Sequence, residues 1–129
     1  MKLYDFGPAA NAQRVRVFLA EKDIDVPVEQ LNVREDRQFA EPYTSMNPFH
    51  CVPFLELDDG TVIAESISIC RYLEELHPEP SLFGRTAEER AVVDMWLRRF
   101  ANYGLANFAE YISCYLGLLL PSFCGERPR

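Results

Sequence analysis

The sequence predicts an α/β domain that begins strand, helix, strand, continues with a hairpin and a helix, and is followed by one long helix of a second, all-helical region. Short runs in which apolar and polar residues alternate, bounded by glycine, proline or aspartate, predict the strands. Between and after them, apolar residues at helical spacing predict the helices. A polar bend at 79–86, with Pro80 and Gly84, separates the two regions. We therefore expect domains at residues 1–78 and 87–129, joined by a linker at 79–86.

The first region opens with a crossover unit. Lys2–Phe6 alternates and stops at Gly7-Pro8, so it is expected to form a strand. Residues 12–22 place apolar side chains on one face and charged ones on the other, which indicates a helix packed on a core. Residues 26–33 form a second extended run, so strand, helix and strand favour a parallel, right-handed unit. A loop with one or two helical turns is expected from 34 to 46.

A hairpin and a second helix follow. Phe54–Leu57 and Thr61–Ala64 flank Asp59-Gly60, the pair that a primed hairpin turn requires, because glycine adopts positive φ without steric cost. Ser66 is a favoured cap for the next helix, which ends before His77-Pro78.

The second region begins with a capping box, in which Thr86 is followed three residues later by Glu89. The apolar residues after it recur at three to five residues: Val92, Met95, Trp96, Phe100, Tyr103, Phe108 and Ile112. Without further helices to cover it, this stripe would form a large apolar surface that favours self-association.

Composition excludes several classes of protein. Thirteen basic against twenty acidic residues give a net charge of −7, which disfavours nucleic acid as a partner. The apolar stretch 112–123 is interrupted by Gly117 and Pro121 and falls short of the roughly 20 residues of a membrane helix. Four cysteines without a secretion signal favour a reducing, cytoplasmic location. With no C-x-x-C pair and two histidines, a zinc site is not expected.

Five segments, taken in order and spacing, resemble the glutathione transferases, whose N-terminal half has a thioredoxin-like fold: MKLYDF, NAQRVRVFLAEKDI, NPFHCVPFLELDDG, AES and ICRYLEELHPEPSLFG. The resemblance covers residues 1 to about 116. It implies that glutathione is the co-substrate, that no metal is used, that a small hydrophobic electrophile binds beside the long helix, and that the chain forms a homodimer. Relatives build several helices after the one starting at Thr86, so the helical domain is expected to be truncated.

The resemblance also implies which residues bind glutathione. The Val52–Pro53 bond would be cis, and the Val52 N–H and C=O would pair with the cysteine of the ligand as an added strand does. Ser66 would bind the γ-glutamyl carboxylate and Glu65 the neighbouring ammonium, while Gln38 would lie near the glycyl carboxylate. From the residues alone, Val52-Pro53 is also a plain strand start, Ser66 an ordinary cap and Glu65 a solvated charge.

The loop near the glycyl carboxylate departs from the family. Relatives commonly have glycine and lysine there, whereas this chain has His50 and Cys51. Weaker glutathione affinity is therefore expected, unless His50 or Arg37 supplies the missing positive charge. A mixed disulfide between Cys51 and the ligand thiol is an alternative.

The larger departure concerns the thiolate, which is the nucleophile of the family. Where many relatives have a serine or cysteine donor before the first helix, this chain has Ala9. A hydrogen bond to a charged group is worth roughly 1.5 to 3 kcal/mol, so its loss would lower the thiolate fraction about ten- to a hundredfold. The remaining catalytic candidates are the Asn11 amide, the first N–H groups of the helix and the Tyr4 hydroxyl. Asn11 is alternatively a helix cap, and Tyr4 a core aromatic.

We therefore expect a glutathione transferase that conjugates the thiolate to a small apolar electrophile with weak activity. The alternative is a non-catalytic module, with a truncated transferase fold, that binds glutathione or another protein. Arg14 and Arg16 either add a favourable field to the site or lie on a solvated helix face. A glutaredoxin-like exchanger is disfavoured because no cysteine stands at the start of the first helix.

Overall fold

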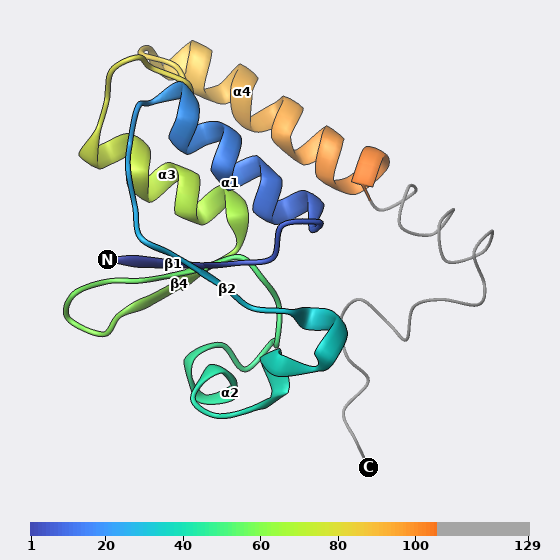
Figure 1. Ribbon diagram of the computed structural model, residues 1–129. Coiled ribbons are helices and arrows are strands. Elements are labelled where there is room, and N and C mark those ends of the chain that lie inside the picture. Colours follow the sequence, from blue (N-terminus) through green and yellow to red (C-terminus); the bar gives the residue numbers. More distant parts are fainter. Residues whose placement is uncertain (106–129) are drawn as a thin grey trace. The chain divides into compact units, whose positions relative to one another are not determined.

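The chain divides into two compact units, Met1–Pro80 and Ser81–Arg129. The computed structural model describes residues 1–105 (Figure 1). The elements of the first unit are, in order, β1 (Lys2–Asp5), α1 (Ala10–Glu21), β2 (Val28–Gln30), two 3₁₀ turns at Val33–Glu35 and Arg37–Phe39, α2 (Tyr43–Met46), β3 (Phe54–Glu56), β4 (Val62–Ala64) and α3 (Ser66–Leu76).

The four strands form one mixed sheet in the order β2-β1-β3-β4. β1 and β2 run parallel, and β3 is antiparallel to both β1 and β4. The sheet thus has the strand, helix, strand and hairpin, helix arrangement of a thioredoxin-like domain, as the sequence predicted. β2 has three residues, whereas the sequence predicted an extended run of eight at 26–33. It is short because only Leu3, Tyr4 and Asp5 of β1 pair with it.

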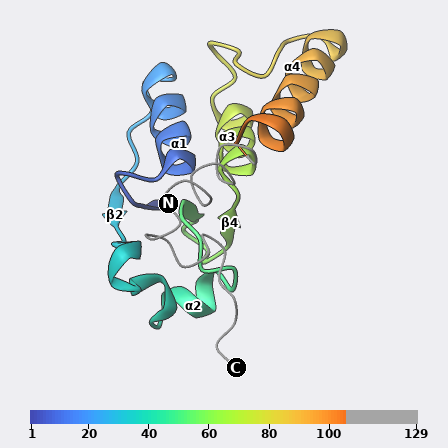
Figure 2. The ribbon, with the colours of Figure 1, turned by 90° about the vertical axis from the view of Figure 1, so that its right-hand side faces the viewer.

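The two faces of the sheet carry different helices. α1 and α3 lie on one face and α2 on the other (Figures 1 and 2). On the α2 face, Tyr4 and Phe54 pack with Tyr43 and Met46. Because side chains alternate along a strand, Leu3 and its partner Leu55 point to the α1 and α3 face, where both are fully buried. The predicted apolar stripe of α1 is confirmed: Val15, Phe18 and Leu19 are buried.

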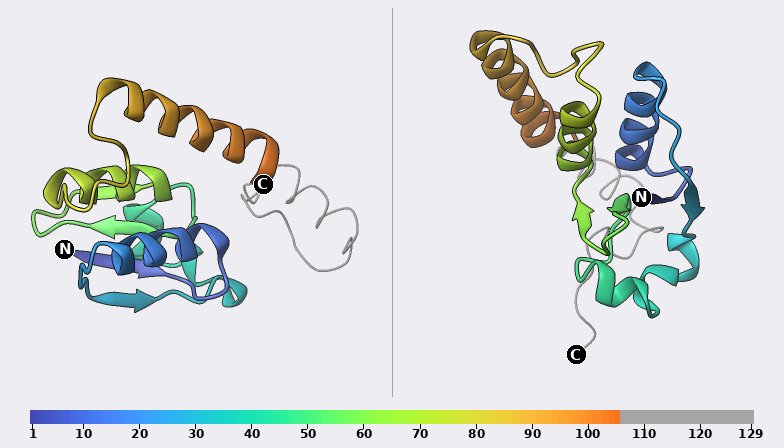
Figure 3. Two further views of the ribbon diagram at one scale, coloured as in Figure 1. Left: turned by 90° about the horizontal axis from the view of Figure 1, so that it is seen from above. Right: turned by 90° about the vertical axis from the view of Figure 1, so that its left-hand side faces the viewer.

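α1 and α3 lie side by side (Figure 3), and a buried ion pair joins them near their C-terminal ends. Lys22 follows α1, and its ammonium lies 2.5 Å from the Glu74 carboxylate and donates to the His77 carbonyl at 2.6 Å. The Lys22 side chain, which makes both contacts, is buried. The C-terminal ends of the two helices are therefore held together, which fixes where their N-terminal ends lie on the opposite edge of the sheet.

Two capping predictions are corrected. Ser66 is the first residue of α3 rather than its cap, because Glu65 takes the cap position with φ of 67° and makes no side-chain cap bond. Asn11 is the second residue of α1, and Ala9 stands at the cap position. The side chains of Ser66 and Asn11 therefore do not cap their own helices.

The second unit contains α4 (Ala87–Arg99), followed by a π-helical segment, Phe100–Leu105. The predicted capping box is confirmed, since the Thr86 hydroxyl accepts from the Glu89 N–H at 3.1 Å while the Glu89 carboxylate accepts from the Thr86 N–H at 3.3 Å. Gly84 precedes it with φ of 93°, and a Cβ there would lie 2.7 Å from that of Glu89. Phe108, Ile112, Cys114, Cys124 and the segment 117–129, on which other predictions rested, lie outside the described residues.

Candidate functional site

The register of the sheet brings the predicted site segments to the same end of the strands. Phe54 pairs with Tyr4 on one side and with Ala64 on the other. The chain leaving β1 toward α1, the Val52-Pro53 step entering β3, and the chain leaving β4 toward α3 therefore all lie at the same end of the strands. Gln30 at the end of β2 pairs with Asp5, so the turn carrying Gln38 also departs from this edge.

The starts of α1 and α3 are linked through Arg14. Its Nη1 donates to the Ser66 hydroxyl oxygen at 2.6 Å and to the Asn11 side-chain oxygen at 3.2 Å. The predicted γ-glutamyl residue and the predicted thiol donor are thus joined by one guanidinium group. The sequence offered Arg14 as a field or as a solvated charge, and these contacts place it between two of the candidate residues.

The Val52 backbone is available for a ligand. The Val52–Pro53 peptide bond is cis, the isomer that the resemblance implied. Within residues 1–105, the Val52 N–H and C=O make no hydrogen bond. An extended ligand could therefore pair with both groups in the way a strand is added to a sheet edge.

Glu65 adopts an uncommon backbone conformation at this edge. Its φ of 67° lies in the left-handed region, which costs a non-glycine residue roughly 1 to 3 kcal/mol and tends to cluster at functional sites. Its side chain is exposed, while Ser66 beside it is buried. The turn thus presents a solvent-facing carboxylate next to a buried hydroxyl.

Gln38 and His50 meet in the structure. The His50 Nδ1 lies 3.3 Å from the Gln38 carbonyl oxygen, and the His50 ring packs against Phe39 with centroids 4.8 Å apart. The Gln38 side chain is buried, and its Oε1 has no hydrogen-bond partner among the described residues. The Cys51 thiol donates to the Phe49 carbonyl at 3.1 Å.

Tyr4 occupies a different environment. Its hydroxyl donates to the Glu56 carboxylate at 2.8 Å, and its ring stacks on Phe54 with centroids 4.5 Å apart. Burial, and then the bond to Glu56, raise the pKa of Tyr4. These contacts are those of the core aromatic that the sequence left as the alternative, so Asn11 is the stronger of the two candidate donors.

A buried polar cluster, which sequence reasoning missed, holds the loop between β1 and α1. The Asp5 side chain is fully buried, and its Oδ2 accepts from Arg16 at 2.6 Å and from Gln30 at 3.2 Å. Arg16 also donates to the Gly7 carbonyl at 2.7 Å, while the Gly7 N–H donates to Gln30 at 3.1 Å. The loop that ends at Ala9 is therefore held by hydrogen bonds from both the C=O and the N–H of Gly7.

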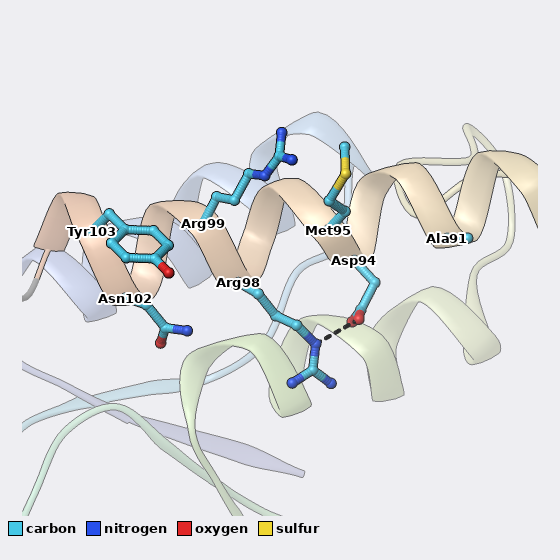
Figure 4. Close-up of a pocket in the computed structure, with 7 residues that line it drawn as sticks. All are labelled: Ala91, Asp94, Met95, Arg98, Arg99, Asn102 and Tyr103. Atoms are coloured by element: carbon cyan, nitrogen blue, oxygen red, sulfur yellow. Dashed lines mark hydrogen bonds and ion pairs between the residues drawn. The ribbon is translucent and has the colours of Figure 1, made fainter.

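An open groove of about 520 Å³ lies along the second unit (Figure 4). Both polar and apolar side chains line it, and they include the Asp94–Arg98 ion pair. The lining residues are Ala91, Asp94, Met95, Arg98, Arg99, Asn102 and Tyr103. None of these is a residue that the sequence assigned to glutathione. Among the described residues, there is no cluster of three or more potential metal ligands.

Comparison with known proteins identifies the family. A family model described as the glutathione S-transferase N-terminal domain matches residues 10–76, just over half of the chain. The chain belongs to the glutathione S-transferase family. The match spans α1 through α3 and so contains the residues predicted to bind glutathione, among them Val52 and Ser66, as well as Arg14.

Individual relatives agree with this assignment. The chain is 38% identical over 95 residues to maleylacetoacetate isomerase of Rattus norvegicus and 38% identical over 92 residues to glutathione S-transferase Z1 of Arabidopsis thaliana, covering 72% and 71% of this chain. A crystal structure of a Gtt2-class glutathione S-transferase from Vibrio parahaemolyticus matches 82% of this chain with 43% identity and a TM-score of 0.73.

The chain spans about half the length of these relatives or less. It covers 44% of the rat isomerase, 41% of the Arabidopsis transferase and 52% of the Vibrio chain. Across residues 1–105, the structure contains no helix with the length and apolar character needed to cross a bilayer.

Proposed function

We propose that the chain binds glutathione and transfers its thiolate to a small apolar electrophile, without a metal. The observation that carries this proposal is the convergence at one sheet edge of an unpaired Val52 backbone and the Arg14-linked side chains of Asn11 and Ser66. Gln38, Glu65 and Pro53 complete the proposed glutathione site. A cytoplasmic location and detoxification belong to the same proposal.

In this proposal the sulfur lies near the start of α1. The first N–H groups of a helix have no partner within the helix and favour a negative charge. The N–H of Gln13 is the first that bonds back, to the Ala9 carbonyl, which leaves those of residues 10–12 for a ligand. After the thiol proton leaves for solvent, the thiolate attacks the electrophilic carbon, a sulfur–carbon bond forms and the leaving group departs.

The test combines glutathione titration by calorimetry with a conjugation assay on a generic aromatic electrophile. Binding with turnover supports the proposal, and absence of binding overturns the site. Ala9→Ser restores the missing donor and should raise the rate about ten- to a hundredfold, because one charge-assisted bond lowers a thiol pKa by about one to two units. Ala20→Ser, on an exposed position of the same helix, is the matched control and should leave the rate unchanged.

Two alternatives predict different outcomes of the same measurements. Relatives named maleylacetoacetate isomerase favour a second candidate, isomerisation of an electrophilic alkene by addition and elimination of the same thiolate. Such an enzyme would consume no glutathione, whereas a transferase would. Binding without any turnover would instead favour a non-catalytic glutathione-binding or protein-interaction module.

A homodimer formed through α4 is also part of the proposal. It is supported by the large apolar side chains that this unit exposes, of which Trp96 is 60%, Phe100 64% and Tyr103 71% exposed. A sedimentation measurement that shows only monomer would count against it.

A further inference from the structure

One nitrogen atom of Arg14 serves both ends of the proposed glutathione site. Nη1 of a guanidinium group carries two hydrogens, and here one points to the Ser66 hydroxyl oxygen at 2.6 Å and the other to the Asn11 side-chain oxygen at 3.2 Å. Arg14 is half-buried; its bond to Ser66 is partly buried and so partly shielded from water, whereas its bond to Asn11 is exposed. The contact joins positions 52 residues apart in the chain.

The bond from Arg14 determines what the Ser66 hydroxyl can do. A hydroxyl group has one hydrogen to donate and accepts through its lone pairs. Because the oxygen accepts from Arg14, the hydrogen remains for another partner, and residues 1–105 provide no acceptor for it. Ser66 is 5% exposed, and a buried, unused donor is costly unless a ligand satisfies it.

Asn11 is exposed, so the bond from Arg14 determines the orientation of its side chain rather than a burial cost. Its side-chain oxygen accepts from Arg14, so its NH₂ group must point the other way. That NH₂ group has no acceptor among the described residues. A carboxamide held in this orientation presents hydrogens rather than an oxygen, which is the polarity that a thiolate requires.

We propose that Arg14 is a positioning residue that aims the Ser66 hydroxyl at the γ-glutamyl carboxylate and the Asn11 amide at the sulfur of glutathione. Both targets are anions, so the guanidinium charge favours each of them as well as orienting its donor. In a chain with Ala9 in place of a hydroxyl or thiol, Arg14 thereby recruits Asn11 as the donor. The inference rests on the proposed function and adds the residue that couples its two binding groups.

The test measures two quantities that Arg14 should move together. Arg14→Gln is expected to weaken binding of S-methylglutathione, which has no free thiol, about tenfold through Ser66. It is also expected to raise the pKa of bound glutathione, followed by the ultraviolet absorbance of the thiolate, by about one unit through Asn11. Arg90→Gln removes the same charge from an exposed position of α4 and should move neither quantity.

Further variants separate positioning from a structural role. Arg14→Lys keeps the charge but not the planar fork, so it should recover part of both losses. In a Ser66→Ala background, Arg14→Gln should cause little further loss of S-methylglutathione affinity while it still raises the thiol pKa. Thermal unfolding of each variant identifies the folded protein. Should Arg14→Gln fail to fold, Arg14→Lys is measured in its place, both alone and in the Ser66→Ala background.

The outcomes distinguish this inference from the function beneath it. If the unchanged chain binds glutathione and folded Arg14→Gln keeps both the affinity and the thiol pKa, positioning by Arg14 is wrong while the proposed function stands. A variant that is less stable, but whose folded fraction binds as before, leads to the same conclusion. If the unchanged chain binds neither glutathione nor S-methylglutathione, both are overturned.

Discussion

Replacing Arg16 by methionine is expected to destabilise the first unit strongly, because it strands a buried charge. The Asp5 side chain is fully buried, its Oδ1 has no partner among the described residues, and its Oδ2 would retain only the neutral Gln30 amide at 3.2 Å. Removing one partner of a buried pair costs about 3 to 5 kcal/mol. Arg16 is itself 34% exposed, so we expect the lower end, about 3 kcal/mol.

The chain provides a matched control in Arg98. Its bond to Asp94 is 2.7 Å long, against 2.6 Å for Arg16 and Asp5, but its side chain is 75% exposed. Arg98→Met should therefore cost much less than Arg16→Met, because an exposed helical ion pair contributes little to stability. The two variants lose the same charge, and they differ in the burial of the aspartate that remains.

Urea denaturation followed by circular dichroism measures the two costs, and hydrogen exchange of the β1 and β3 amides assigns the loss to the first unit. A unit of this size holds about 4 to 12 kcal/mol, so Arg16→Met should lower its melting temperature by about 12 to 24 °C. Adding Asp5→Asn removes the stranded charge and should recover part of the loss. Equal costs for Arg16→Met and Arg98→Met would refute the reasoning.

Two further predictions concern titration and reactivity. Bonds from Lys2 and then Tyr43 lower the pKa of Glu29 from its ordinary 4.5, so the stability that this carboxylate contributes is present above pH 4.5 and lost as the pH falls through the lower folded value. Glu29→Gln should flatten the fall in unfolding free energy between about pH 5 and pH 3; an unchanged slope would contradict this. Burial raises the pKa of Cys70 to about 11, so iodoacetamide at pH 8 should label it about a hundredfold more slowly than a thiol with the ordinary pKa of 9.0, and more slowly than the half-buried Cys51. Peptide mass spectrometry measures both rates, and comparable labelling would show that Cys70 is accessible.

The parts of the fold that depend on local chemistry could be predicted from the sequence. Gly60 takes the positive φ expected of it, 83°, but Asp59 does not, so the predicted primed turn is wrong: the Gly60 N–H bonds to the Leu57 carbonyl and closes a turn over Asp58 and Asp59. The capping box of Thr86 and Glu89 is a contact between near neighbours, and both of its bonds are present. The length of β2 could not be predicted, because it depends on how many partners β1 supplies rather than on the alternation of β2 itself.

The site was predictable only in part, for the same reason. The resemblance assigned glutathione binding to Val52, Glu65 and Ser66, and the register brings the segments that carry these residues to one end of the strands. The role of Arg14 depends on a contact with Ser66, which no periodicity within α1 can reveal. The unusual φ of Glu65 likewise follows from the join between β4 and α3 and not from a residue that favours it.

The core and the site of this unit depend on the same contacts. Phe54 stacks on Tyr4 and pairs with Ala64, so its position in the sheet determines both the α2-side core and the place where Val52-Pro53 meets the start of α3. A slip of β3 by one residue would turn Leu55 toward the wrong face and would move Val52 by about 3.3 Å along the strand. A ligand that bonds to Val52 and Ser66 together could not span that displacement with the same hydrogen bonds. The burial of Leu55 and Phe54 therefore enforces the register that the proposed glutathione binding requires.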